Sequence, residues 1–282
     1  MLGYEAMHRG FRRIVRRVVL GDGAREDEAL SDWLATLMSE ANGLPSKRSE
    51  SYEPFVDRIH HYVADAEPGS LVGLIADAPC GVDTLAEGQV PHWLFAMQDT
   101  LSVNVLRTLA LIVSHPSQGE RVARELGAAR RRSPELSAED VAGLAYLRAC
   151  LCEAMRLWTT TPLLSRETLV ELSWRGARVP AGTQILIFNT FHHRDRERLP
   201  YADRFAPEEW TKGAAGEDWG LNFFSHGPQE CPGADLALFV GGAVLAELLA
   251  ARTLTAQSGG LDPLRPLPHM LDAFALRFAL AA

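Results

Sequence analysis

The segment 224–233, with the sequence Phe-Ser-His-Gly-Pro-Gln-Glu-Cys-Pro-Gly, constrains what this chain can fold into and bind more than any other segment. Its glycines and prolines restrict the backbone to a shaped loop, and Cys231 stands just before a long apolar helical run. Backbone N–H groups and the dipole at a helix start stabilise a thiolate, and Phe224 upstream can cover the sulfur. The segment therefore predicts a metal-bound thiolate. An isolated cysteine of this kind, however, is more often a free, buried side chain.

This segment resembles the cysteine-ligand loop of the cytochrome P450 family, FxxGxxxCxG, and fills its four fixed positions with Phe224, Gly227, Cys231 and Gly233. The resemblance implies that Cys231 ligates the iron of haem b (iron protoporphyrin IX) as a thiolate. It also implies the cytochrome P450 fold, mainly α with a minor β region. The implied activity is that of a monooxygenase, which uses O2 to insert one oxygen atom into a small organic substrate.

A second feature is the pair Glu153 and Arg156, whose i, i+3 spacing places the carboxylate and the guanidinium on one helix face. Such pairs are common on helix surfaces, so the spacing alone is a weak signal. Upstream of the cysteine loop, it resembles the family's structural Glu–Arg ion pair beneath the haem loop. A buried pair of this kind usually needs a further partner for its remaining donors.

The family commonly supplies that partner as the arginine of a PERF or PERW segment. This chain has Pro-Glu-Glu-Trp at 207–210, so Glu209 occupies the arginine position. Two carboxylates around Arg156 would leave an excess of buried negative charge unless Arg204 or Arg194 compensates. We expect Arg156 to hold both glutamates.

The third feature is the pair Asp99 and Thr100, in a long helical stretch. It resembles the family's oxygen-binding groove, AGxDT, although Met97 replaces the usual glycine. In the family this acid and alcohol relay protons during oxygen activation, so the resemblance makes Asp99 and Thr100 catalytic candidates. The alternative is a polar interruption on a solvent-facing side of the helix. The bulk of Met97 would narrow the groove.

Three residues are candidates for binding the haem propionates. Arg166 ends a Pro-Leu-Leu-Ser-Arg segment that resembles the family's propionate-binding arginine segment. Two positions before the cysteine, where the family often has arginine or histidine, this chain has Gln229, which donates a hydrogen bond without a charge. His226 is a possible substitute for that missing charge.

A zinc site is disfavoured. Cys150 and Cys152 are separated by one residue on a helical stretch, so they point to different faces and form no clamp. His192 and His193 are adjacent and are expected to be structural or exposed.

Composition narrows the partners and the compartment. The 28 basic and 36 acidic residues give a formal net charge of −8, which argues against nucleic acid or an anionic membrane as partner. Four cysteines are too few for a disulfide framework and favour a reducing cytoplasm. No stretch approaches the ~20 uncharged apolar residues of a membrane span. The arginine-rich start is compatible with a transit peptide, but its apolar stripe favours a helix packed on a core.

Helical periodicity dominates the first half, and strand-like runs come later, without the βαβ alternation of a parallel sheet. We therefore predict a single, predominantly α domain over 1–282. The expected helices span the opening stripe to Leu20, then 26–41, 52–65, 68–77, 84–114 (bent or broken near Pro91), 117–129, 137–157 and 234–252, and the expected strands span 167–174, 184–189 and 272–280.

The opening helix resembles one from the middle of a full cytochrome P450, and the family's N-terminal WxxxR pair has no equivalent before Glu26. The chain thus corresponds to the middle and C-terminal part of the fold. One interpretation is a cytoplasmic, soluble, bacterial-type monooxygenase, reduced by ferredoxin and ferredoxin reductase or by flavin-type donors. The alternatives are a catalytically inactive P450-like remnant and a haem-binding or sensing protein without turnover.

Overall fold

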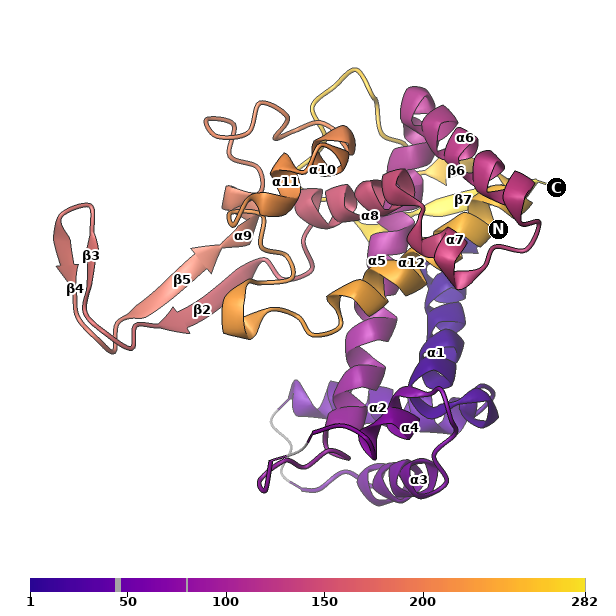
Figure 1. Cartoon of the computed structure of the whole chain (residues 1–282), viewed down its shortest axis with the longest axis vertical. Coiled ribbons are helices and arrows are strands. Elements are labelled where there is room, and N and C mark those ends of the chain that lie inside the picture. The colour runs from indigo at the N-terminus through magenta and orange to yellow at the C-terminus, as the bar shows by residue number, and fades with distance from the viewer. Residues whose placement is uncertain (44–46, 80, 282) are drawn as a thin grey trace. The chain divides into compact units, whose positions relative to one another are not determined.

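The computed structural model describes residues 1–43, 47–79 and 81–281 (Figure 1). The chain divides into two compact units. The smaller unit comprises Tyr4–Ser102, and the larger unit comprises Met1–Gly3 together with Val103–Ala282. The long helix α5 (Gln89–Ser114) runs from the smaller unit into the larger one.

The smaller unit is helical, and its first helix buries the apolar stripe expected from the sequence. Met7, Phe11, Val15 and Val19 are buried along α1, so the opening segment packs on a core as an amphipathic helix. Asp27 caps the second helix by accepting a hydrogen bond from the backbone of Leu30, which explains why that helix begins two residues later than predicted. The helices of this unit are α1 (Tyr4–Leu20), α2 (Glu28–Ala41), α3 (Tyr52–Ala64), α4 (Leu71–Ile75) and the first part of α5, with a 3-10 turn η1 (Asp22–Ala24).

Helix α5 begins at Gln89, later than the predicted start at residue 84, and Pro91 lies in its first turn. A proline there lacks only an N–H that would have no partner in the helix, so Pro91 does not break it. The expected apolar positions Leu94, Leu101 and Val105 are buried. Met97 is also buried, so its side chain belongs to this core face.

The larger unit contains the remaining helices. The single helix predicted over 137–157 is interrupted at Gly143, because the Glu125 carboxylate accepts hydrogen bonds from the backbone N–H groups of Tyr146 and Leu147 at 2.8 and 2.9 Å and so starts a new helix. That helix, α8, is buried along almost its whole length. The helices are α6 (Pro116–Arg132), α7 (Ala138–Ala142), α8 (Ala145–Leu157), α9 (Asn189–His192), α10 (Glu208–Thr211), α11 (Ala214–Glu217) and α12 (Ala234–Ala251), with 3-10 turns η2 (Gly227–Gln229) and η3 (Ala273–Ala275).

The strands form three small antiparallel sheets. The predicted strand 167–174 is wrong: Thr168 bonds to Pro180 and Thr183, which ends one strand before the next begins. The predicted closing strand starts at Arg277, after η3. The pairs are β2 (Leu163–Glu167) with β5 (Gln184–Phe188), β3 (Leu172–Trp174) with β4 (Ala177–Val179), and the order β1 (Leu2–Gly3), β7 (Arg277–Ala281), β6 (Thr253–Ser258).

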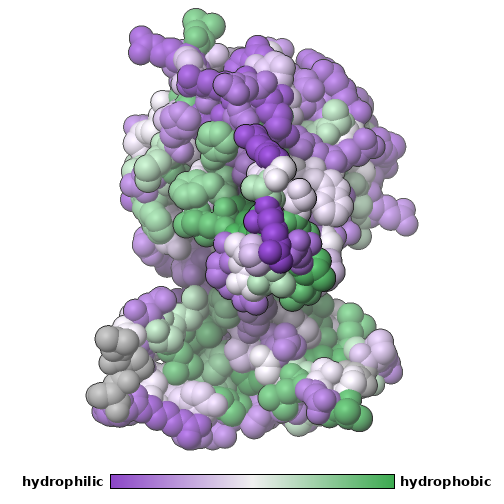
Figure 2. Space-filling view, turned by 90° about the vertical axis from the view of Figure 1, so that its left-hand side faces the viewer, coloured by the Kyte–Doolittle hydropathy of each residue, from purple (hydrophilic) through white to green (hydrophobic). Residues whose placement is uncertain are grey.

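Figure 1 shows β2 and β5 as a two-stranded arm that leads into the β3–β4 hairpin. The register places Leu163 opposite Phe188 and Ser165 opposite Leu186, so these residues share one face, and its apolar side chains are exposed. Figure 2 views the molecule from the side of this arm and shows hydrophobic surface there. Exposed apolar side chains gathered in one place are unusual on a soluble domain.

Among the described residues, one helix is long and apolar enough to cross a membrane by length and composition, namely α12. The sequence analysis expected no such segment. Helix α12 contacts α6, α7 and α8, buries Leu238 and Leu245, and carries the charged Asp235 and Glu247. These are properties of a helix that packs on the core of the larger unit.

Candidate functional site

The cysteine loop closes on itself just before α12. The backbone N–H of Cys231 donates to the carbonyl of Phe224 at 2.7 Å, and the N–H of Glu230 donates to Gly227 at 3.0 Å. Gly227 has a φ of +66°, in the left-handed region that favours glycine. Cys231 itself is a free, exposed cysteine. An ordered loop therefore presents an accessible thiol.

The other described cysteines differ from Cys231. Cys150 and Cys152 lie in α8 and are buried. Burial raises the pKa of the Cys152 thiol to about 12 and raises the pKa of Cys150 well above its ordinary value. Burial therefore disfavours the thiolate form of both side chains. Cys80 lies outside the described residues, within which no cluster of three His, Cys, Asp or Glu side chains could hold a metal.

The structure pairs Glu153 with Arg156 in the core of the larger unit. Both side chains are fully buried. Arg156 donates from Nε to Oε2 at 2.7 Å and from Nη2 to Oε1 at 2.6 Å, which is the bidentate geometry that makes such pairs strong. Its Nη1 donates to the carbonyls of His193 and Ala202 at 2.7 and 2.9 Å, and Nη2 also reaches Arg204 O at 3.0 Å. The guanidinium thus fastens α8 to the chain that precedes the cysteine loop.

The expectation that Arg156 also holds Glu209 is wrong. Glu209 accepts from Lys212 Nζ at 2.8 Å, in a pair whose lysine is largely exposed. One carboxylate already neutralises Arg156, and burying a second would leave an uncompensated charge. Of the two proposed compensating residues, Arg194 binds Asp203 and Arg204 donates to the carbonyl of Pro200.

The partner that the sequence analysis missed is Trp210, which follows Glu209. Its indole Nε1 donates to Glu153 Oε2 at 2.8 Å, and the backbone N–H of Ala206 donates to Oε1 at 2.9 Å. The sequence feature that could have predicted this contact is the tryptophan itself, because an indole removed from water needs an acceptor for its N–H.

His193 connects the ion pair to the segment that leads into the cysteine loop. Its carbonyl accepts from Arg156, and its Nε2 accepts from the backbone N–H of Asn222 at 3.0 Å. The side chain is fully buried, and its ring meets Phe223 edge-on at 6.1 Å. Burial lowers the pKa of His193 to about 4, so the imidazole is neutral at neutral pH.

We expect the free energy of unfolding to decrease as the pH falls from the ordinary histidine value of 6.5 towards about 4. In this window the unfolded chain binds a proton at His193 that the folded chain does not, which costs about 3 kcal/mol in all. Burial lowers the pKa of His115 in the same direction. Urea unfolding at several pH values measures the slope, and a His193→Asn variant should reduce it. An unchanged slope in that variant would contradict the assignment.

The three residues predicted to bind the haem propionates differ in their contacts with the cysteine loop and in their exposure. Arg166 on β2 is close to it, with Nη2 at 3.4 Å from Ser225 Oγ. His226 stacks on Trp219 at 5.0 Å, and its Nε2 is buried without a hydrogen-bond partner among the described residues. Gln229 is exposed in η2. The loop thus carries an accessible thiol, an amide and an unsatisfied imidazole nitrogen and is contacted by a guanidinium, which fits a thiolate-bound cofactor that carries carboxylates.

The acid–alcohol pair lies in the smaller unit. The Asp99 carboxylate pairs with His8, whose Nε2 is 2.7 Å from Asp99 Oδ1. His8 lies on α1 and stacks on Tyr4 at 5.3 Å. Thr100 is exposed and donates to the carbonyl of Ala96 at 2.5 Å, which leaves its hydroxyl oxygen open to a donor. His8 is a partner of Asp99 that the sequence analysis missed.

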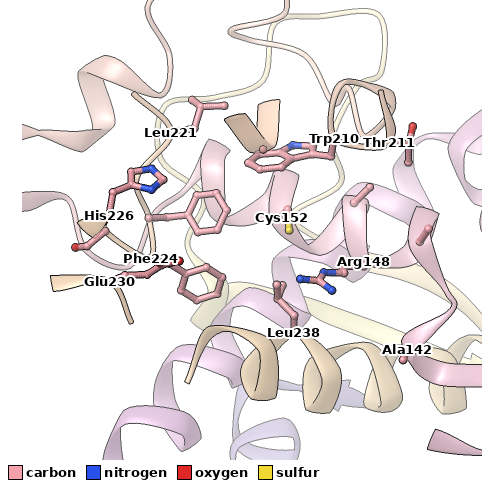
Figure 3. Close-up of a pocket in the computed structure, with 15 residues that line it drawn as sticks. Ala142, Arg148, Cys152, Trp210, Thr211, Leu221, Phe224, His226, Glu230 and Leu238 are labelled. Carbon is pink, nitrogen blue, oxygen red and sulfur yellow. The ribbon is translucent and has the colours of Figure 1, made fainter. Parts of the chain in front are cut away.

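One pocket of about 540 Å³ adjoins the cysteine loop (Figure 3). Trp210 and Phe224 project into it from opposite sides, and Cys152 and Leu238 line it from the two helices α8 and α12. Arg148 and Glu230 add charges to its lining. Residues of the cysteine loop and Trp210 of α10 therefore line the same pocket.

Residues 84–271 match the family model of cytochrome P450. A methyltetrahydroprotoberberine 14-monooxygenase of Papaver somniferum is 28% identical, with 69% of this chain and 38% of the relative covered. A cyclooctat-9-en-7-ol 5-monooxygenase of Streptomyces melanosporofaciens is 33% identical, with 53% and 33% covered. This chain thus spans less than half the length of these relatives.

Among solved structures, the crystal structure of the cytochrome P450DA heme domain is similar, with a TM-score of 0.80 and 20% sequence identity. The similarity covers 100% of this chain and 68% of that one. It shows that the fold is the mainly α fold with small sheets that the sequence predicted. The family match includes the Glu153–Arg156 pair and the Cys231 loop. The chain belongs to the cytochrome P450 family.

Proposed function

We propose that the chain is the middle and C-terminal part of a haem-thiolate monooxygenase that inserts one oxygen atom of O2 into a small organic substrate. The observation that carries the proposal is the exposed, free Cys231 on a self-closed loop of a chain from this family. The two relatives described above are named as monooxygenases, which supports the reaction class.

Cys231 would hold the haem iron, and Phe224, Gly227 and Gly233 would shape and cover the loop. Haem, when bound, supplies the oxygen activation and the oxidising chemistry. Cys231 lies just before α12, and as a ligand it would bind the iron through its deprotonated sulfur.

The haem propionates would be held by charged and polar groups around the loop. Arg166 offers a guanidinium that contacts the loop at Ser225. His226 offers a buried nitrogen in need of a partner, and Gln229 offers an exposed amide. A carboxylate that met these donors would satisfy them together.

Asp99 and Thr100 would donate and accept protons. The Asp99 carboxylate is bound to the His8 imidazole, so a proton can be shared between Oδ1 and Nε2. The Thr100 hydroxyl has its own proton committed to Ala96, so its oxygen can accept a hydrogen bond from a ligand. An acid and an alcohol at adjacent positions would then hold and transfer protons.

The proposal also covers the proteins that would supply electrons and the cell compartment of the enzyme. We infer separate ferredoxin and ferredoxin reductase, or flavin-type donors, for a soluble bacterial-type enzyme in the cytoplasm. The family resemblance and the net charge of −8 support this part, as does the presence of a Streptomyces relative.

The test is the absorption spectrum of the chain after haem titration, reduction and addition of carbon monoxide. We expect one haem per chain and the band of a thiolate-ligated, CO-bound haem. The same chain unfolded in urea is the control for non-specific haem binding, and it should show no such band. A folded chain that binds no haem, or binds it without the band, would favour the inactive remnant.

A further inference from the structure

We propose that Trp210 is a positioning residue for the cysteine loop, because its indole joins the buried Glu153–Arg156 pair to the segment that carries Cys231. The proposal rests on the proposed function only where it treats Cys231 as the haem ligand. The coupling between Trp210 and the loop can be measured without haem.

The first step is the hydrogen bond from Trp210 to Glu153. The Glu153 carboxylate receives four donors: Arg156 Nε and Nη2, the backbone N–H of Ala206, and Trp210 Nε1. A carboxylate has about four acceptor sites, so every site is used. The indole is therefore held in one orientation by a fully buried charge.

The second step is the aromatic contact from Trp210 to the loop. The Trp210 ring lies 5.5 Å from the Phe223 ring, and Phe223 lies 5.0 Å from Phe224. The Phe224 carbonyl accepts the backbone N–H of Cys231 at 2.7 Å. Figure 3 shows Trp210 and Phe224 reaching into the same pocket. Rings at these distances attract one another and resist displacement.

The third step is that Trp210 binds Glu153 without adding a charge to the buried pair. Glu153 and Arg156 already balance each other, so a further buried cation would have no counter-charge. The indole N–H fills the last acceptor site of Glu153 without adding charge, and the same ring packs on Phe223. Glu209, the neighbour of Trp210 in sequence, binds Lys212 instead and takes no part. Trp210 thus links the pair to the loop through its own side chain, whereas His193 contacts Arg156 through its backbone carbonyl.

The experiment is hydrogen–deuterium exchange on the full chain without haem, comparing wild type with Trp210→Phe. Phenylalanine keeps a ring against Phe223 but removes the N–H. We expect the amides of 224–233 to exchange roughly tenfold faster or more, as a lost hydrogen bond to a charged group predicts. The control is Trp158→Phe, which removes a more deeply buried indole that donates to Pro268 O at 2.9 Å. It should leave loop exchange unchanged.

A second variant, Phe223→Leu, removes the ring contact and leaves the ion pair intact. It should also speed exchange in 224–233, and the double variant should be no faster than the faster single variant, because both act through one path. Equal acceleration in Trp210→Phe and Trp158→Phe would overturn the proposal, as would fully additive effects. If Trp210→Phe does not fold, unchanged exchange in Phe223→Leu overturns it instead.

The haem-loaded chain separates this proposal from the proposed function. If wild type shows the thiolate-type band, Trp210→Phe should reduce the fraction of haem in that form, while Trp158→Phe should not. If wild type shows no such band, the proposed function fails, and the exchange measurements still decide whether Trp210 positions the loop.

Discussion

A Cys231→Ser variant is expected to lose the thiolate-type, CO-bound haem spectrum completely. Cys231 is the exposed cysteine among the three that the structure describes. Serine has the same shape, but its hydroxyl stays protonated and offers a hard oxygen in place of a soft sulfur. Since the side chain is exposed, we expect the free energy of unfolding of the haem-free chain to change by less than about 0.5 kcal/mol.

The measurement is the reduced, CO-bound spectrum of the variant at a fixed haem concentration, together with urea unfolding of the haem-free chain. Cys152→Ala is the matched control, because Cys152 lines the pocket beside the cysteine loop and its thiol is buried, whereas Cys231 is exposed. That control should keep the band. A band of wild-type intensity in Cys231→Ser would show that another group ligates the iron.

The long helices and the cysteine loop could be predicted from local spacing, because a helix repeats its buried face every three or four residues. The stripe through Phe11 and Val15 and the positions Leu94 to Val105 are buried for this reason. Where the helices begin was harder to predict. Helix α8 starts where Glu125 from another helix accepts its first N–H groups, and no residue near Ala145 carries that information.

The environment of Arg156 could not be predicted, because its partners are largely backbone atoms. The resemblance of 207–210 to the family's PERF or PERW segment predicted that Glu209 lies near Arg156. The chain satisfies the guanidinium with carbonyls of His193, Ala202 and Arg204, and every residue type has a carbonyl. The pairing of His8 with Asp99, 91 residues apart, likewise depends on how α1 and α5 pack.

An Arg156→Leu variant is expected to lose about 3–5 kcal/mol of stability, a large part of the 5–15 kcal/mol typical of a folded protein. Leucine would leave the Glu153 carboxylate charged and fully buried with only Ala206 and Trp210 as donors. It would also leave the carbonyls of His193 and Ala202 without this partner. We expect a largely unfolded or insoluble chain, measured by circular dichroism and urea unfolding.

Two further variants separate loss of the buried pair from loss of an arginine. Arg130→Leu removes the partner of Glu247 in a more exposed pair, with contacts of 3.1 Å, and should cost less than about 1 kcal/mol. The double variant Glu153→Leu with Arg156→Leu removes both charges and should be more stable than Arg156→Leu alone, because the isolated carboxylate, rather than the missing attraction, causes most of the loss. If Arg156→Leu were no more harmful than Arg130→Leu, the buried pair would not be what holds α8 to the chain before the cysteine loop.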